Sequence, residues 1–316
     1  MKLSKLYGVC ALSALVAFSA VSCIDEDLSN CPPPDRELHI TYRIRLSEDQ
    51  DESFNQKLTS VHMGFWTADD SLVREVVIPS EELPEDMTFA VTLPVDNYSH
   101  LVTANCQRPP SGDHVPFADA ITEVAIEQFE TGDDTIGAMK IPPYAGLLRI
   151  NLEDSAQTEY VVDLRPVVGK MEITLNHSAN LSNIRCHVGG TKAGCICWIS
   201  DWIDNPELIT DATAYAAPTD EELTDLYSFY TFPTAAGEGG AAGAPATKAG
   251  ADGQWMLYFY ADYADRTMQW AFTIDEPLYA GHVYRNEFTI SEFDDNETGV
   301  EVNPDWKPGT DIDVDM

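Results

Sequence analysis

The stretch Glu37-Leu38-His39-Ile40-Thr41-Tyr42-Arg43-Ile44-Arg45-Leu46 decides the fold class of this chain. Every second residue from Leu38 to Leu46 is apolar, and each residue between them is polar or basic. Successive side chains of a β-strand point to opposite faces of the sheet. This period of two therefore predicts a strand with one buried face.

The same alternation returns through the first half of the sequence, in residues 61–65, 72–78, 89–93 and 98–106. Prolines and turn-forming residues separate these segments, as at Pro109-Pro110-Ser111-Gly112. Short strands at this spacing, punctuated by turns, are typical of a β-sandwich or barrel. His100 stands alone on an apolar strand face, which favours a core or edge histidine with satisfied hydrogen bonds over a ligand.

The second half repeats the pattern after Pro166, in residues 168–175, 184–188, 195–199, 254–260, 268–274 and 282–290. We therefore expect an all-β protein with two domains, residues 37–165 and residues 166–316. Residues 235–253 are nearly all Ala and Gly, which bury little area, so they are predicted to form a loop inside the second domain.

Two short helices are also predicted. Apolar residues recur at intervals of three and four between Ala118 and Glu130, which is the helical period, and Gly132 follows as a stop signal. A second helix is expected over Asp220–Phe229, because acidic residues in its first turn suit the helix dipole.

The N-terminus indicates export. Lys2 and Lys5 precede an almost wholly apolar run, residues 6–20, which is too short to span a hydrocarbon layer of about 30 Å comfortably. Small residues then lead to Cys23. This order predicts a cleaved lipoprotein signal over residues 1–22, lipid on the thiol of Cys23, and an acidic, proline-containing tether over residues 23–36.

The composition excludes some partners. The chain has 18 Lys plus Arg against 53 Asp plus Glu, a formal net charge of −35. Such a surface repels nucleic acid and anionic lipid headgroups. We therefore expect no nucleic-acid partner, and membrane attachment through the lipid on Cys23 rather than through a basic patch.

The cysteines that remain after Cys10 and Cys23 are Cys31, Cys106, Cys186, Cys195 and Cys197. Five is an odd number, so a complete disulfide framework is impossible. The group of Cys186, Cys195 and Cys197 leaves three alternatives open: buried free thiols, one disulfide, or a metal site shared with His187. The spacing of this group matches no standard zinc pattern.

Catalytic motifs are missing from the sequence, which has no G-x-S-x-G, no H-E-x-x-H, no phosphate-binding loop and no dinucleotide fingerprint. We predict that the chain is not an enzyme and needs no cofactor. Asp311, Asp313 and Asp315 lack the Gly and Glu of a calcium loop, so a solvated tail is expected. Trp198 and Trp202 are the candidate exposed pair for stacking on a sugar, which makes a glycan-binding surface lipoprotein the alternative function.

Four motifs carry a resemblance to a known family. They are Cys23-Ile24-Asp25-Glu26-Asp27-Leu28-Ser29-Asn30-Cys31-Pro32, Leu164-Arg165-Pro166-Val167-Val168-Gly169-Lys170, Pro277-Leu278-Tyr279-Ala280-Gly281-His282-Val283-Tyr284, and the ending from Asp305-Trp306 to Asp311-Ile312-Asp313. With these four motifs in this order, the chain resembles the FimB-like fimbrial anchor subunits of Bacteroidales, the lipoproteins at the base of type V pili.

The resemblance implies a fold and a function. The fold would be two tandem transthyretin-like β-sandwich domains, attached through Cys23 to the outer membrane. Asp25-Glu26-Asp27 is similar to the signal that sends Bacteroidota lipoproteins to the cell exterior. The implied role is to hold the base of the pilus and limit its length, with the stalk pilin and other fimbrial subunits as partners. Polymerising relatives exchange strands between subunits, and the sequence does not identify the strand concerned.

Overall fold

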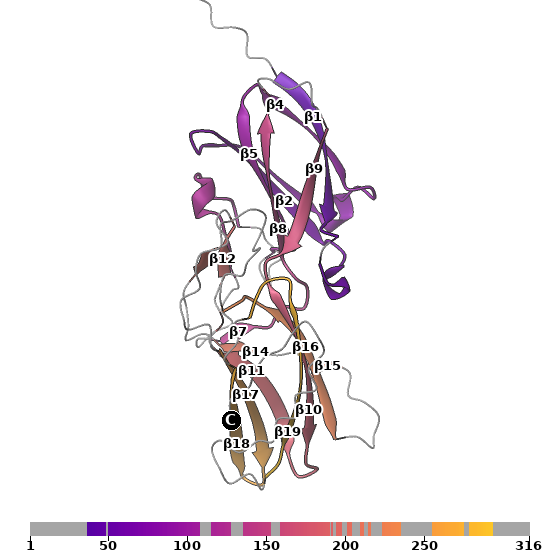
Figure 1. The fold of residues 1–316 in the computed structure, drawn as a ribbon, viewed down its shortest axis with the longest axis vertical. Helices are drawn as coiled ribbons and strands as arrows, with labels where there is room; N and C mark the ends of the chain where they lie inside the picture. The colour runs from indigo at the N-terminus through magenta and orange to yellow at the C-terminus, as the bar shows by residue number, and fades with distance from the viewer. Residues whose placement is uncertain are drawn as a thin grey trace, which may run out of the picture.

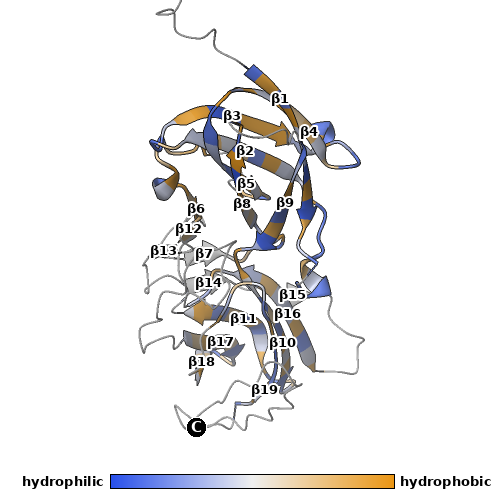
Figure 2. Ribbon diagram, turned by 45° about the horizontal axis from the view of Figure 1, so that its top comes forward, coloured by the Kyte–Doolittle hydropathy of each residue, from blue (hydrophilic) through white to orange (hydrophobic). Residues whose placement is uncertain are grey.

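The computed structural model describes residues 37–48, 50–107, 115–127, 135–152, 159–189, 191, 194–197, 201–203, 209–211, 214–215, 223–234, 255–274 and 278–292. Strands dominate these residues, which confirms the predicted all-β class. Figure 1 shows two β-rich lobes stacked along the long axis of the molecule. Hydropathy alternates along many strands, as expected where one face is buried (Figure 2).

The first lobe is a sandwich made by one bent sheet. Its strands are β1 (Glu37–Leu46), β2 (Ser60–Thr67), β3 (Leu72–Pro79), β4 (Thr88–Pro94), β5 (Asn97–Ala104), β8 (Tyr144–Asn151) and β9 (Glu159–Pro166), in the order β3-β2-β5-β8-β9-β1-β4. β8 and β9 pair only at Tyr144–Pro166 and Ala145–Arg165. The two halves of the sheet therefore diverge and enclose one core, in which the Tyr42 ring of β1 meets the Phe65 ring of β2 at 6.2 Å.

β1 has the burial pattern that its sequence predicts. Ile40, Tyr42 and Ile44 are buried, and the residues between them are more exposed. β1 pairs with β4 on one side, antiparallel from Glu37 to Arg43, and with β9 on the other, parallel from Thr41 to Leu46. The strand is thus held along both edges.

The second lobe has two main sheets. One contains β15 (Ala214–Tyr215), β16 (Thr224–Thr231), β10 (Gly169–His177) and β19 (Val283–Ile290), and the other contains β18 (Arg266–Ile274), β17 (Trp255–Tyr263), β11 (Ser182–Gly189), β14 (Ile209–Asp211) and β7 (Thr135–Gly137). Aromatic rings from both sheets fill the space between them, with Phe272 and Phe288 centred 4.6 Å apart and Phe259 and Phe288 5.5 Å apart.

Part of the first half of the chain belongs to sheets of the second half. β6 (Ala125–Glu127) pairs with β12 (Gly194–Ile196), which also pairs with β13 (Asp201–Ile203). β7 pairs in parallel with β14. The sequence order therefore does not separate the two lobes at a single residue.

Both predicted helices are wrong. Over Ala118–Glu130, the described residues form a single 3-10 turn, η4 (Ile121–Glu123), followed by β6. The side chains of Ile121, Val124 and Ile126 are buried against the outer face of the first sandwich. They reach this face from a chain that is extended beyond η4 rather than helical. The described part of Asp220–Phe229 begins β16, whose residues from Thr224 to Thr231 pair with β10. Sheet pairing outweighs the local helical signal in both places.

Two further 3-10 turns occur at η2 (Glu52–Phe54) and η3 (Ser80–Glu82). Asp51 begins η2, with its carboxylate accepting a hydrogen bond from the Ser53 amide at 2.8 Å. Hydrogen bonds from the side chain and the amide of Ser53 lower the pKa of Asp51. The predicted core position of His100 is confirmed, since its ring is fully buried and stacks on Phe65 at 4.0 Å. The predicted satisfaction of its hydrogen bonds holds only for Nδ1, because Nε2 has no partner among the described residues.

Candidate functional site: strand β1 and the lobe junction

β1 runs the length of the first lobe. Figure 1 shows that it begins at the pole remote from the second lobe and continues toward the junction. The turn η2, which follows β1, reaches the second lobe: the rings of Phe54 and Tyr230 are centred 5.6 Å apart. The first described residue, Glu37, therefore lies at one end of a strand whose other end leads to the junction.

Hydrogen bonds hold the junction end of β1. The Ser47 amide, just beyond the strand, donates to the Leu164 carbonyl at 2.8 Å, and the Ile44 amide donates to the Met87 carbonyl at 3.0 Å. Arg45 Nε also donates to Asp163 Oδ1 at 2.5 Å, and this hydrogen bond raises the pKa of Arg45. β1 is therefore bonded to β4 on one side and to β9 on the other.

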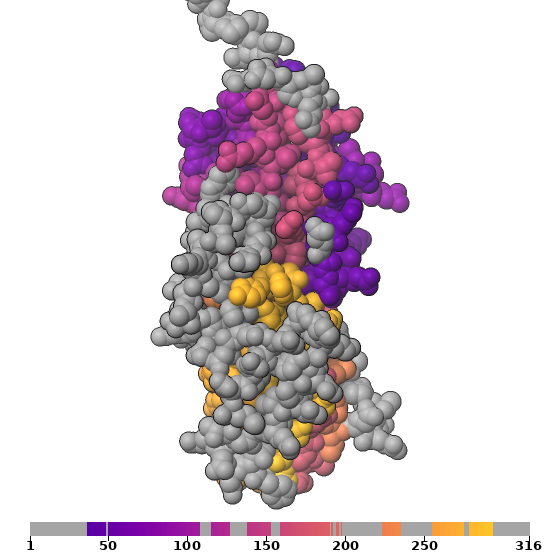
Figure 3. Space-filling view, viewed as in Figure 1, coloured from indigo at the N-terminus to yellow at the C-terminus, as the bar shows by residue number. Residues whose placement is uncertain are grey.

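The lobe junction is a buried core. Its apolar residues come from both lobes, and they include Phe54, Trp66, Leu101, Ile121, Val167, Val168, Cys195, Tyr230, Phe232 and Val283. Tyr230 Oη donates to the Ser53 carbonyl at 2.9 Å, and Tyr144 Oη donates to the Phe54 carbonyl. Figure 3 shows the chain at the start of β19 lying against the first lobe. The two lobes therefore share one apolar core, and the hydrogen bond of Tyr230 crosses from the second lobe to the first.

Two of the sequence motifs meet at this junction. The Gly281 amide donates to the Val168 carbonyl at 2.9 Å, and the Lys170 amide donates to the His282 carbonyl at 2.9 Å. Gly281 has φ +76°, a left-handed conformation that glycine adopts without strain. A Cβ on Gly169 would lie 2.8 Å from the carbonyl oxygen of Tyr279. The glycines in both motifs therefore permit close contact between the chain entering β10 and the turn before β19.

Gly169→Ala tests the close packing at the junction. The added methyl would push against backbone, so we expect a loss of about 2 kcal/mol in the free energy of unfolding, the usual cost of overpacking. Chemical denaturation of the full chain measures this loss. Val161→Ala, which truncates an exposed side chain of β9, is the control and should change stability little. Equal stability of Gly169→Ala and the parent would show that the contact can relax.

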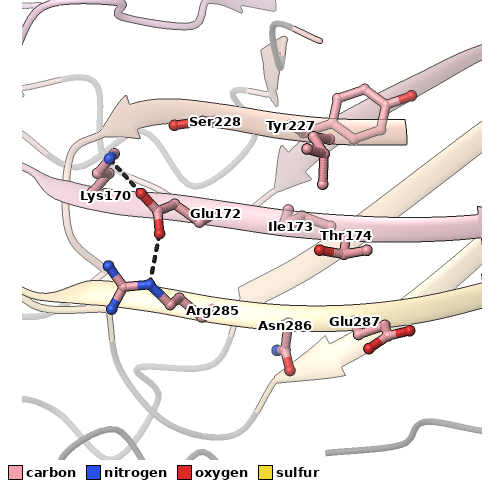
Figure 4. A pocket seen from close by; sticks show the side chains of 10 residues that line it. Lys170, Glu172, Ile173, Thr174, Tyr227, Ser228, Arg285, Asn286 and Glu287 are labelled. Carbon is pink, nitrogen blue, oxygen red and sulfur yellow. Dashed lines mark hydrogen bonds and ion pairs between the residues drawn. The ribbon is translucent and has the colours of Figure 1, made fainter. Parts of the chain in front are cut away.

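A groove of about 600 Å³ lies on the outer face of β16, β10 and β19. Its charged residues are paired, as Figure 4 shows: Glu172 accepts from Arg285 Nε at 2.6 Å and contacts Lys170. Burial would raise the pKa of Glu172, but the two cations outweigh burial and lower it. Farther along, Asn176 Nδ2 donates to Glu287 at 2.6 Å. The contacts of Glu172 with Arg285 and of Asn176 with Glu287 join β10 to β19, so we assign the groove a structural role.

Two kinds of residue named from the sequence lie outside the described residues: the predicted site residues Cys23 and Trp198, and Asp311, Asp313 and Asp315 of the predicted solvated tail. Trp202 belongs to β13, whose backbone alone is described. The structure therefore does not bring Trp198 and Trp202 together in a described surface. No helix among the described residues has the length and apolarity needed to cross a bilayer.

The described cysteines are free thiols. Cys186, Cys195 and Cys197 are buried, and Cys106 is partly exposed. Burial raises the pKa of Cys186 well above its usual value. Within the described residues, no group of three or more His, Cys, Asp or Glu side chains could hold a metal ion. Of the three alternatives, the structure supports buried free thiols.

Fold and site together define the class of protein: two stacked β-sandwiches joined by a buried core, with an N-terminal strand paired on both sides. A comparison with curated protein sequences finds no match. The model of one protein family, described as the fimbrillin-A associated anchor proteins Mfa1 and Mfa2, matches residues 28–309. The chain therefore belongs to this family of fimbrial anchor proteins.

Solved structures show the same fold at low sequence identity. A protein described as a candidate adhesin from Bacteroides ovatus is 13% identical, with a TM-score of 0.58, over 89% of this chain and 96% of that one. A protein described as a candidate polysaccharide-binding protein from Bacteroides thetaiotaomicron is 12% identical, with a TM-score of 0.55, over 80% and 92%. A candidate cell adhesion protein from Bacteroides eggerthii is 11% identical, with a TM-score of 0.51, over 89% and 95%.

Proposed function

We propose that this chain is the subunit that anchors a fimbria to the outer membrane, on the exterior of the cell. The observation that carries the proposal is the family match over residues 28–309. The lipoprotein-type N-terminus supports the point of attachment, because acyl chains on Cys23 would hold the mature chain to the membrane.

The fold suits a tensile role. Force from the membrane would enter through residues 23–36 and reach β1 at Glu37. β1 shares that force with β4 through seven residue pairs. It shares force with β9 through six more. The junction core then passes the load to the second lobe. When force acts along the length of paired strands, several hydrogen bonds must break at once. When force peels one strand away from its end, the hydrogen bonds break one at a time.

The proposed partners are the stalk pilin and other fimbrial subunits. A subunit fixed to the membrane occupies the base of the fibre, and a fibre whose base is occupied cannot lengthen there. We therefore propose that the chain both holds the fimbria and limits its length. No catalytic step enters this role.

Deletion of the gene tests the proposal. We expect fimbriae to detach into the medium and to change in length, with both defects reversed by a restored copy. Electron microscopy and immunoblots of cells and medium measure attachment and length. An affinity pull-down from outer membranes should recover fimbrial subunits with this chain. Normal attachment and normal length in the deletion strain would contradict the proposal.

A further inference from the structure

Two tyrosines form a platform on the outside of the second lobe. β17 places Trp255, Leu257 and Phe259 in the core, so Tyr258 and Tyr260 point to the opposite, outer face of the sheet. Both side chains are half-buried, and their rings are centred 6.4 Å apart with an interplanar angle of 30°. We call this pair of aromatic side chains on the outer face of β17 the Tyr258–Tyr260 platform.

Neighbours on β11 hold both rings. Register pairs His187 with Tyr258, Arg185 with Tyr260 and Gly189 with Met256. A Cβ on Gly189 would lie 2.8 Å from Cε2 of Tyr258, so the ring occupies the space that a side chain would take. The Tyr260 ring meets the His187 ring edge-on at 5.1 Å. Both rings therefore extend over β11 and are fixed before any ligand arrives.

The β18 side of the platform is open and polar. Tyr258 pairs with Ala271 and Tyr260 with Gln269, and both β18 residues are exposed. Ala271 is too short to cover the neighbouring ring. The Gln269 amide can donate and accept hydrogen bonds beside the platform.

Arg185 supplies cationic donors at the Tyr260 end. Its guanidinium lies over the Tyr260 ring, 5.8 Å from the ring centre, and its side chain is 54% exposed. It reaches Asp262 only at 4.0 Å, the outer limit of an ion pair. Asp262 is held instead by Asn183 and Thr267, each at 2.8 Å, and these hydrogen bonds lower its pKa. The platform thus has a donor at one end and an amide along one side.

We propose that the Tyr258–Tyr260 platform binds neutral hexopyranose chains. A pyranose ring has an apolar C–H face that packs on an aromatic ring, and hydroxyl groups at its edge that hydrogen-bond to side chains such as Gln269 and Arg185. The net charge of −35 repels polyanions, so nucleic acid and acidic polysaccharides are disfavoured as ligands. This site adds a surface-binding function to anchoring.

The test is affinity electrophoresis of the full chain, purified in detergent, through native gels that contain a neutral glucan, mannan or galactan. We expect at least one of these polysaccharides to retard the protein. Tyr258→Ala and Tyr260→Ala should each weaken the apparent affinity about tenfold, because each removes one stacking surface. Gly189→Ala should weaken it similarly by displacing the Tyr258 ring, although both tyrosines remain.

Controls separate the platform from folding and from anchoring. Tyr279→Ala removes a half-buried tyrosine near the junction and should keep the retardation of the parent. The midpoint of thermal unfolding of each variant shows whether it is folded, and fimbriae should remain attached in cells that express Tyr258→Ala. Absence of retardation in all three polysaccharides, or full retardation of folded Tyr258→Ala, would overturn the inference. Retention by a charged polysaccharide alone would also overturn it.

Discussion

Replacing Cys23 with Ser is expected to remove this protein from the outer membrane. A hydroxyl at this position cannot form the thioether that carries lipid, and the acidic surface offers no basic patch to hold the chain on anionic headgroups. The acyl chains are thus the proposed attachment, and their loss should be nearly complete rather than partial. Fimbriae that depend on this anchor should then appear in the medium.

Metabolic labelling with a fatty acid and immunoblotting of outer-membrane fractions measure this effect. The variant should incorporate no label. Cys31→Ser, a change in the same tether that leaves Cys23 in place, is the matched control and should stay labelled and membrane-bound. Because both changes lie before β1, the folded lobes should unfold at an unchanged temperature. Retention of Cys23→Ser in the outer membrane, with fimbriae attached, would refute lipid anchoring.

Acidification from pH 7.5 to pH 5 is expected to destabilise the first lobe through His100. The ring is fully buried, and Nδ1 lies 3.0 Å from the Gly64 carbonyl, which can only accept, so Nδ1 carries the proton of the neutral ring. Nε2 has no hydrogen-bond partner among the described residues. Burial lowers the pKa of His100 from its ordinary 6.5 to about 4, although the Gly64 hydrogen bond acts in the opposite direction.

The direction of the pH effect follows from this lowered pKa. Between pH 6.5 and pH 4 the unfolded chain binds a proton at His100 that the folded chain does not. The contribution of His100 to the free energy of unfolding is therefore fully present above pH 6.5, its pKa in the unfolded chain. This contribution is lost as the pH falls toward about 4, its pKa in the folded chain. At pH 5 the loss from this one group is about 2 kcal/mol, and below pH 4 it approaches about 3 kcal/mol.

His100→Phe isolates this contribution, because it keeps an aromatic ring in the core but cannot be protonated. Denaturant unfolding at the two pH values should show a loss on acidification that is smaller by about 2 kcal/mol than in the parent. Val102→Ala, also fully buried in β5, is the control; it should lower stability at both pH values and keep the parental difference. Identical pH dependence in His100→Phe and the parent would exclude His100 as the source.

Sequence reasoning succeeded where a local pattern and a buried sheet face coincide. β1, β10 and β17 alternate in sequence and alternate in burial, because a strand with one buried face repeats every two residues. It failed for the described parts of the two predicted helices, residues 118–127 and 223–229. Apolar spacing favoured a helix in the first segment and acidic residues in the first turn favoured one in the second, but strands distant in sequence provide the surface or the pairing partner in each case. The pattern of residues within a segment does not show which distant strands will pack against it.

The features of the candidate site also fall into two groups, those that the sequence predicts and those that only the tertiary structure shows. By itself, the sequence determined the all-β class, the acidic surface and the prediction of lipid at Cys23, because composition and short-range order are sufficient for each. Only the tertiary structure decided that β6 and β7 join sheets of the second half, that Gly169 lies against the Tyr279 carbonyl, and that Tyr258 covers Gly189. Contacts of this kind join residues far apart in the chain, and no periodicity within either partner specifies the other.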